Sequence, residues 1–175
     1  RGDVGCKCRI AAMNGLAALA RMVAVQQPLE GAGSEFLSIE LLVQIIGMLL
    51  KQFCEKLDFV RSEAAKCLLV LLDEKSSIEA YITEKQMLID ALTPSQFSGR
   101  LTYPSVNWAD ASITYPMVME AAEIDEYFSY VISGLVLSVG GLTKSITENA
   151  SLVLVKWTRS ATNVKLDRLG IGKSI

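Results

Sequence analysis

The sequence predicts an all-α protein, a HEAT- or armadillo-like α-solenoid of antiparallel helix pairs with one long irregular loop. Apolar residues recur at helical spacing along most of the 175 residues, no segment shows the apolar–polar alternation of a half-buried strand, and one helical pattern occurs twice. Because each helix pair of such a stack buries one face on the next pair, we expect residues 1–160 to form a single solenoid segment. We expect residues 161–175 to be a tail, with disorder as one interpretation of it.

The repeated pattern lies in the N-terminal half of the chain. Residues 8–16, which read CRxxAxxxL, align with residues 60–68, which read VRxxAxxxL. An aspartate, Asp3 or Asp58, precedes each copy and suits a helix N-cap. The small alanine leaves room for a neighbouring helix. We therefore expect residues 3–25 to be the second helix of a cut repeat.

Capping signals and apolar spacing place the other helices. The pattern Ser-x-x-Glu, a capping box, begins at Ser76 and again at Ser145, and the pair Gly140-Gly141 is typical of a helix C-terminus. A short turn is expected at Leu57-Asp58. The predicted elements are a helix pair over 35–74, a helix over 76–92 and a helix pair over 124–160.

The helical pattern stops in residues 93–117, which hold three of the four prolines and four aromatic residues. A loop of this length without regular structure is uncommon and tends to be functional or disordered, and the aromatic residues argue against disorder. We expect an irregular loop whose rings pack on the helices. If the loop instead contacts a partner, Trp108 and Tyr103 are the expected anchors, because buried aromatic side chains dominate interface energetics.

The two aligned arginines, Arg9 and Arg61, are the charges that the repeat singles out. On the second helix of a stacked pair, an arginine can bridge to acidic groups of the next repeat. A structural ladder is the first interpretation, and contact with a partner is the second. Both are therefore candidate partner-binding residues.

Composition excludes several classes of function. The formal net charge of −2 gives no electrostatic basis for binding nucleic acid, and the absence of histidine excludes a Ser-His-Asp triad, a Cys-His pair and a histidine-containing zinc site. We expect no metal, no cofactor and no catalysis.

An acidic cluster at Glu120–Glu126 suits the N-terminus of the following helix, and a carboxylate catalyst there would need a deep polar cleft. The uncharged stretch 127–143 is short for a membrane span and predicts a buried helix. The four cysteines predict reduced thiols in the cytoplasm.

Several segments resemble the C-terminal region of the tubulin-folding cofactor D family. The most specific is residues 134–145, GLVLSVGGLTKS, and shorter ones are residues 2–13, 59–65 and 106–108. The resemblance implies a HEAT- and armadillo-type solenoid that acts after the cytosolic chaperonin, binds β-tubulin and helps to join it to α-tubulin. It also implies partnership with cofactors C and E and an ADP-ribosylation-factor-like small GTPase, which together stimulate GTP hydrolysis by tubulin. The alternative is a generic helical-repeat scaffold unrelated to tubulin.

Overall fold

The computed structural model describes residues 3, 5–26, 37–73, 78, 81–93 and 106–160, and this described part is all-helical. It contains seven α-helices and no strand, which confirms the predicted fold class. The helices are α1 (Cys6–Gln26), α2 (Ile39–Phe53), α3 (Asp58–Leu71), α4 (Lys85–Ala91), α5 (Ala111–Ala121), α6 (Asp125–Val139) and α7 (Lys144–Ser160).

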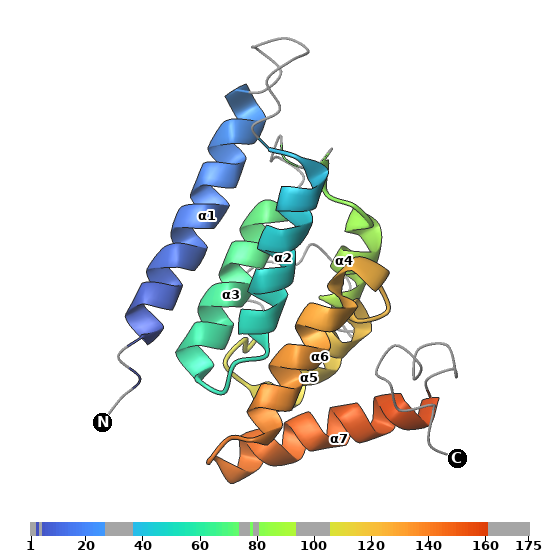
Figure 1. Ribbon diagram of the computed structural model, residues 1–175. Helices are drawn as coiled ribbons and strands as arrows, with labels where there is room; N and C mark the ends of the chain where they lie inside the picture. The colour runs from blue at the N-terminus through green and yellow to red at the C-terminus, as the bar shows by residue number, and fades with distance from the viewer. Residues whose placement is uncertain are drawn as a thin grey trace.

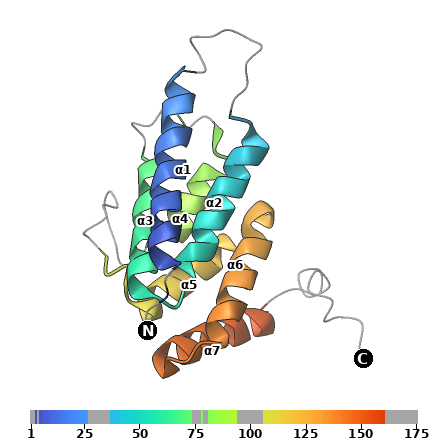
Figure 2. The ribbon, with the colours of Figure 1, turned by 60° about the vertical axis from the view of Figure 1, so that its left-hand side comes forward.

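The helices stack side by side, as in a helical solenoid (Figure 1). The antiparallel helices α2 and α3 form a pair, α1 packs on α3, and α2 packs on α6. Both ribbon views show α7 lying across one end of α6 (Figure 2), and α7 also packs against α5. A single hydrophobic core runs from Met13 on α1 to Trp157 on α7.

Two glycines allow α2 and α6 to approach each other closely. A Cβ atom on Gly134 of α6 would lie 2.8 Å from the Cβ of Cys54 and 2.9 Å from the carbonyl oxygen of Lys51. A Cβ atom on Gly47 of α2 would lie 2.5 Å from the ring of Tyr130. Each position therefore excludes any larger residue without a local shift. This explains the glycine that opens the 134–145 segment.

The predicted irregular loop 93–117 is wrong at its C-terminal end, because residues from Ala111 onward form α5 with Pro116 inside it. The Asp110 side chain caps this helix by accepting a hydrogen bond from the Ser112 amide. Proline inside a helix costs about 3 kcal/mol. Burial of an apolar face, including Tyr115, offsets that cost.

The predicted helix over 76–92 is also wrong at residues 82–84, which the structure describes as non-helical. Its described remainder is α4, which begins only at Lys85. Glu84 has φ 52° and ψ 35°, a left-handed conformation that cannot continue a right-handed helix. The capping box that begins at Ser76 lies outside the described residues, as do Tyr103 and the tail 161–175.

Among the described helices, α1 is long and apolar enough to cross a membrane. Core helices of soluble proteins meet the same two criteria. The uncharged stretch that the sequence singled out behaves differently. Its residues up to Val139 belong to α6, whose Tyr127, Val131 and Leu135 are fully buried in the core.

Candidate functional site

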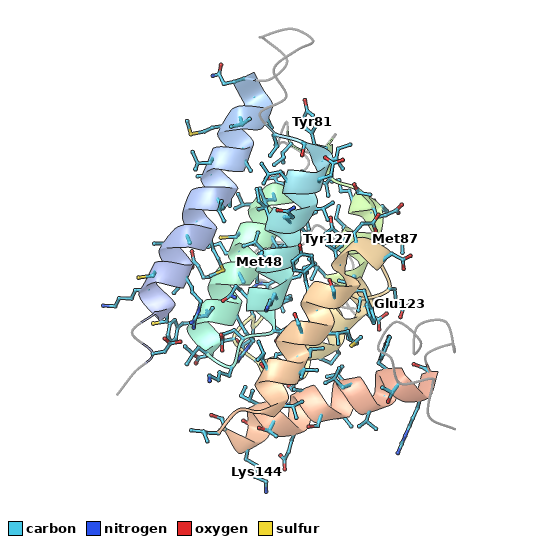
Figure 3. All side chains as sticks on the ribbon, viewed as in Figure 1. Met48, Tyr81, Met87, Glu123, Tyr127 and Lys144 are labelled. Carbon is cyan, nitrogen blue, oxygen red and sulfur yellow. The ribbon has the colours of Figure 1, made fainter. Side chains whose placement is uncertain are left out.

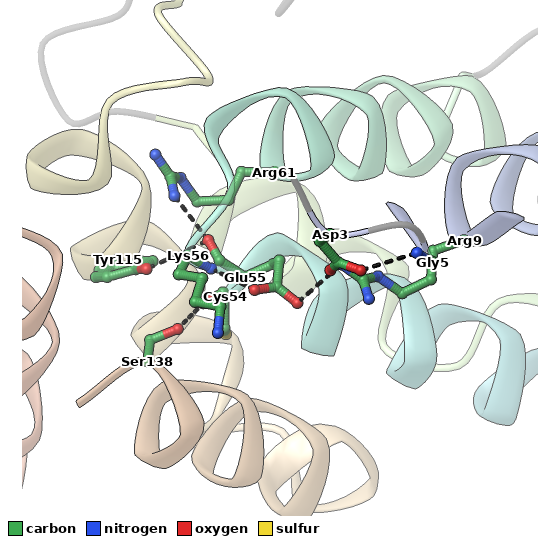
Figure 4. Close-up of polar contacts among 9 residues, drawn as sticks. All are labelled: Asp3, Gly5, Arg9, Cys54, Glu55, Lys56, Arg61, Tyr115 and Ser138. Carbon is green, nitrogen blue, oxygen red and sulfur yellow. Dashed lines mark hydrogen bonds and ion pairs between the residues drawn. The ribbon is translucent and has the colours of Figure 1, made fainter. Parts of the chain in front are cut away.

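The polar contacts of the core converge on the turn between α2 and α3, at the carbonyl groups of Cys54 and Glu55 (Figure 4). The Glu55 carbonyl accepts hydrogen bonds from Arg61 Nη1 at 2.7 Å and from the Tyr115 hydroxyl at 3.4 Å. The Cys54 carbonyl accepts one from the Ser138 hydroxyl. We call this set of residues the Glu55 junction. It connects the α2–α3 turn to α3, α5 and α6.

Arg61 is almost fully buried, with 2% of the residue exposed. Besides the Glu55 carbonyl, its guanidinium donates to the carbonyl of Ala109 and lies 5.7 Å from the centre of the Tyr115 ring. Backbone carbonyls and an aromatic face therefore compensate a charge that burial would otherwise penalise. Partner contact by Arg61 stays a prediction, and its burial favours the structural interpretation.

Arg9 reaches the same turn from α1. Its guanidinium donates to Asp3 at 2.6 Å and pairs with the Glu55 carboxylate at 3.5 Å. The hydrogen bond from Arg9, and then that from the Gly5 amide, hold the pKa of Asp3 below its ordinary value. The two aligned arginines thus meet at one residue, Glu55, in a bridge between neighbouring repeats. Partner contact by Arg9 stays a prediction.

Trp108 is 3% exposed and packs against Phe53 of α2, with ring centroids 6.0 Å apart. The ring therefore belongs to the core, which is the first of the two interpretations of the loop. A buried ring reaches a partner only if this segment opens. Tyr103, the other expected anchor, lies outside the described residues, so the structure gives no test of it.

A cleft of about 600 Å³ lies between α5 and α7. Its α5 wall includes Met119, Glu120 and the following Glu123, and its α7 wall includes Lys156 and Trp157. The Trp157 indole donates a hydrogen bond to the Glu123 carboxylate at 3.3 Å. Figure 3 shows Glu123 in the turn between α5 and α6. The acidic cluster therefore borders a cleft, but the carboxylate hypothesis requires a deep polar one, and an indole and a thioether share this lining.

Apolar side chains are also exposed on the outside of the stack. On α1 they form a surface that we call the α1 outer face. Its members are Leu16, Leu19, Met22 and Val25, each between 44% and 64% exposed. The corner between α6 and α7 exposes Leu137 and Leu142 as well. A helix that is apolar on all sides is typical of one that is covered on all sides, so these surfaces suit protein contact.

Burial favours the neutral forms of two thiols and one phenol in the core. Burial raises the pKa of Cys54 far above its ordinary value and that of Cys67 to about 11, and it also raises the pKa of Tyr115. A thiol that stays protonated is a poor nucleophile. Among the described residues, no group of three or more cysteine, aspartate or glutamate side chains could hold a metal ion.

The chain is similar to a known protein family. The model of the tubulin folding cofactor D C-terminal family matches residues 43–170, more than half of the chain. The chain belongs to this family. No solved structure matches it.

The extent of the cofactor D match bears on two parts of the chain. It includes all the junction residues of the α2–α3 turn, α3, α5 and α6, whereas α1 with Arg9 precedes it. It also includes residues 161–170, so the first two thirds of the predicted tail are part of the family's C-terminal region.

Sequence reasoning missed Glu55, Tyr115 and Ser138 as members of the junction. Ser138 lies inside the segment that carried the family resemblance, so its position was visible but its role was not. Glu55 sits beside the predicted turn, yet its contacts come from residues as far away in sequence as Tyr115. No local pattern reports such a contact.

Proposed function

We propose that this cofactor D segment binds β-tubulin and holds it while it joins α-tubulin, after release from the cytosolic chaperonin. Membership of the tubulin folding cofactor D C-terminal family carries this proposal. The same membership supports three finer features of the proposal. In this proposal the segment works together with cofactors C and E and an ADP-ribosylation-factor-like small GTPase. It contributes to the stimulation of GTP hydrolysis by tubulin, and it acts in the cytoplasm near the cytoskeleton.

The structure supports a mechanism based on contact. A helical stack tied together at the Glu55 junction presents fixed surfaces, and preorganised surfaces lose little conformational entropy on binding. The α1 outer face exposes Leu19 and Met22 at 58% and 64%. Such a surface can cover apolar area on an unassembled subunit until the second subunit replaces it. In this mechanism the segment breaks no bond.

The test is a binding measurement between the purified chain and β-tubulin with variants on the α1 outer face. Leu19→Glu with Met22→Glu should weaken binding at least about tenfold, because a charge would then face the apolar contact. Met87→Glu on α4 is the matched control, since Met87 is likewise exposed, at 45%, and should bind as the unchanged chain does. Absence of saturable binding by the unchanged chain would refute the proposed function.

A further inference from the structure

A second stripe of small and apolar residues runs along α1, on the side that faces away from the core. Figure 1 shows α1 at the edge of the stack. The residues of this stripe are spaced alternately three and four apart and are all exposed, and we call them the α1 seam. They are Cys8, Ala11, Gly15, Ala18, Met22 and Val25. At about 100° per residue, the seam lies about 160° around the helix from the buried stripe that runs from Met13 to Ala24. This spacing is the heptad pattern by which one helix packs along another.

The N-terminal half of the seam consists of small side chains. A Cβ atom added at Gly15 would meet nothing within 4 Å, so no described residue lies against this point. Small residues let two helices approach closely, and large side chains of the second helix then fill the space between them. At the other end, Met22 is 64% exposed, and Leu19 beside the seam is 58% exposed. The seam therefore suits a helix whose own contact residues are large and apolar.

Basic side chains flank the seam on one edge. Lys7 and Arg21 directly precede the seam residues Cys8 and Met22, at the heptad position that carries charges for choosing a partner. The two basic residues lie two heptads apart, which is about 21 Å along the helix axis. Both are exposed, and neither joins another described residue through a hydrogen bond or an ion pair. The sequence of α1 contains no acidic residue.

The acidic groups that the structure places against α1 are engaged with other side chains. Asp3 and Glu55 pair with Arg9, and Glu63 pairs with Lys66 on its own helix. A helix that covers the seam therefore has to supply its own carboxylates to balance the flanking basic side chains. A second copy of α1 cannot supply them, because α1 has none.

We propose that the α1 seam binds an amphipathic α-helix of β-tubulin with large apolar side chains at heptad spacing and acidic side chains along one edge. The acidic side chains lie two heptads apart, opposite Lys7 and Arg21. This inference rests on the proposed function and deepens it, because it specifies which kind of element of β-tubulin the α1 side of the stack recognises.

Charge reversal on the flanking edge tests the acidic part of the inference. Lys7→Glu with Arg21→Glu should weaken binding of the full chain to β-tubulin at least about tenfold, because the new carboxylates would repel those of the bound helix. The matched control is Lys156→Glu with Arg159→Glu on α7, where both residues are also exposed and the change in net charge is the same. The control should bind as the unchanged chain does. Equal binding by the two charge-reversal variants overturns the inference.

The same measurement separates this inference from the proposed function. If the Leu19→Glu, Met22→Glu variant weakens binding and charge reversal at Lys7 and Arg21 does not, tubulin binding stands and the acidic helix is refuted. If the unchanged chain does not bind β-tubulin at all, both are refuted.

Carbodiimide crosslinking identifies the side chain opposite the seam, because it joins an amine only to a carboxylate in contact with it. The expected product joins Lys7 to an aspartate or glutamate within a helix of β-tubulin. The pair Lys144 and Glu148, 3.6 Å apart, is the internal control and should crosslink in every sample. Gly15→Leu fills the open point of the seam and should lower the yield of the Lys7 product several-fold. An unchanged yield in this variant, or Lys7 products confined to copies of this chain, overturns the inference.

Discussion

Replacing Trp108 with alanine distinguishes a core residue from a partner anchor. The ring is 3% exposed and packs on Phe53, so its removal leaves a cavity in the core. Truncation of a buried tryptophan to alanine costs about 3–5 kcal/mol. For a chain of this size, each kcal/mol lowers the melting temperature by about 2–4 °C. We therefore expect Trp108→Ala to lower it by about 6–20 °C.

Thermal and urea unfolding followed by circular dichroism at 222 nm measure this loss. Trp108→Phe is the matched control, because a phenyl ring keeps part of the contact with Phe53 and should cost less than half as much. A loss below about 0.5 kcal/mol for Trp108→Ala, the range of surface substitutions, would refute the assignment of this ring to the core. Weakened tubulin binding with unchanged stability would instead assign Trp108 to an interface.

Four further predictions concern the packing, one ion pair and a buried thiol. Gly134→Ala should lower the free energy of unfolding by about 1–3 kcal/mol, because the new methyl group would lie 2.8 Å from the Cβ of Cys54. Gly15→Ala, where a Cβ meets nothing within 4 Å, should instead stabilise α1 by about 0.5–1 kcal/mol. The depressed pKa of Asp3 means that its pair with Arg9 stabilises the first turn of α1 above pH 3.8 and is lost as the pH falls below that value. An NMR titration of Asp3 should give a midpoint below 3.8 that rises in Arg9→Gln, and an unchanged midpoint would contradict the pairing. Iodoacetamide should leave Cys54 unlabelled in the folded chain and label it in urea, and rapid labelling of the folded chain would show that Cys54 is exposed.

The helical period sufficed to predict the fold class, and local signals placed most helices. The clearest failure concerns α5, because three prolines led us to expect an irregular loop as far as residue 117, and the Asp110 cap was not identified from the sequence. A single proline ends a helix only when packing does not compensate for it, and α5 buries residues on both sides of Pro116. The left-handed Glu84 had no signal in the sequence, because glutamate is an ordinary helix former.

The candidate site could be predicted only in part. The repeat pointed to Arg9 and Arg61, and the acidic cluster pointed to Glu120 and its neighbours. Their partners are set by tertiary packing, as with the hydrogen bond from Trp157 to Glu123, which joins α7 to the turn between α5 and α6. Periodicity and caps report on contacts within an element, and the junction and the cleft are built from contacts between elements.

The most direct test of the central claim, that this cofactor D segment works by holding a tubulin subunit, is sedimentation velocity of the full chain mixed with β-tubulin. The claim predicts a faster-sedimenting complex that disappears in the Leu19→Glu, Met22→Glu variant and persists in Met87→Glu. Independent sedimentation of chain and β-tubulin at every ratio would contradict it.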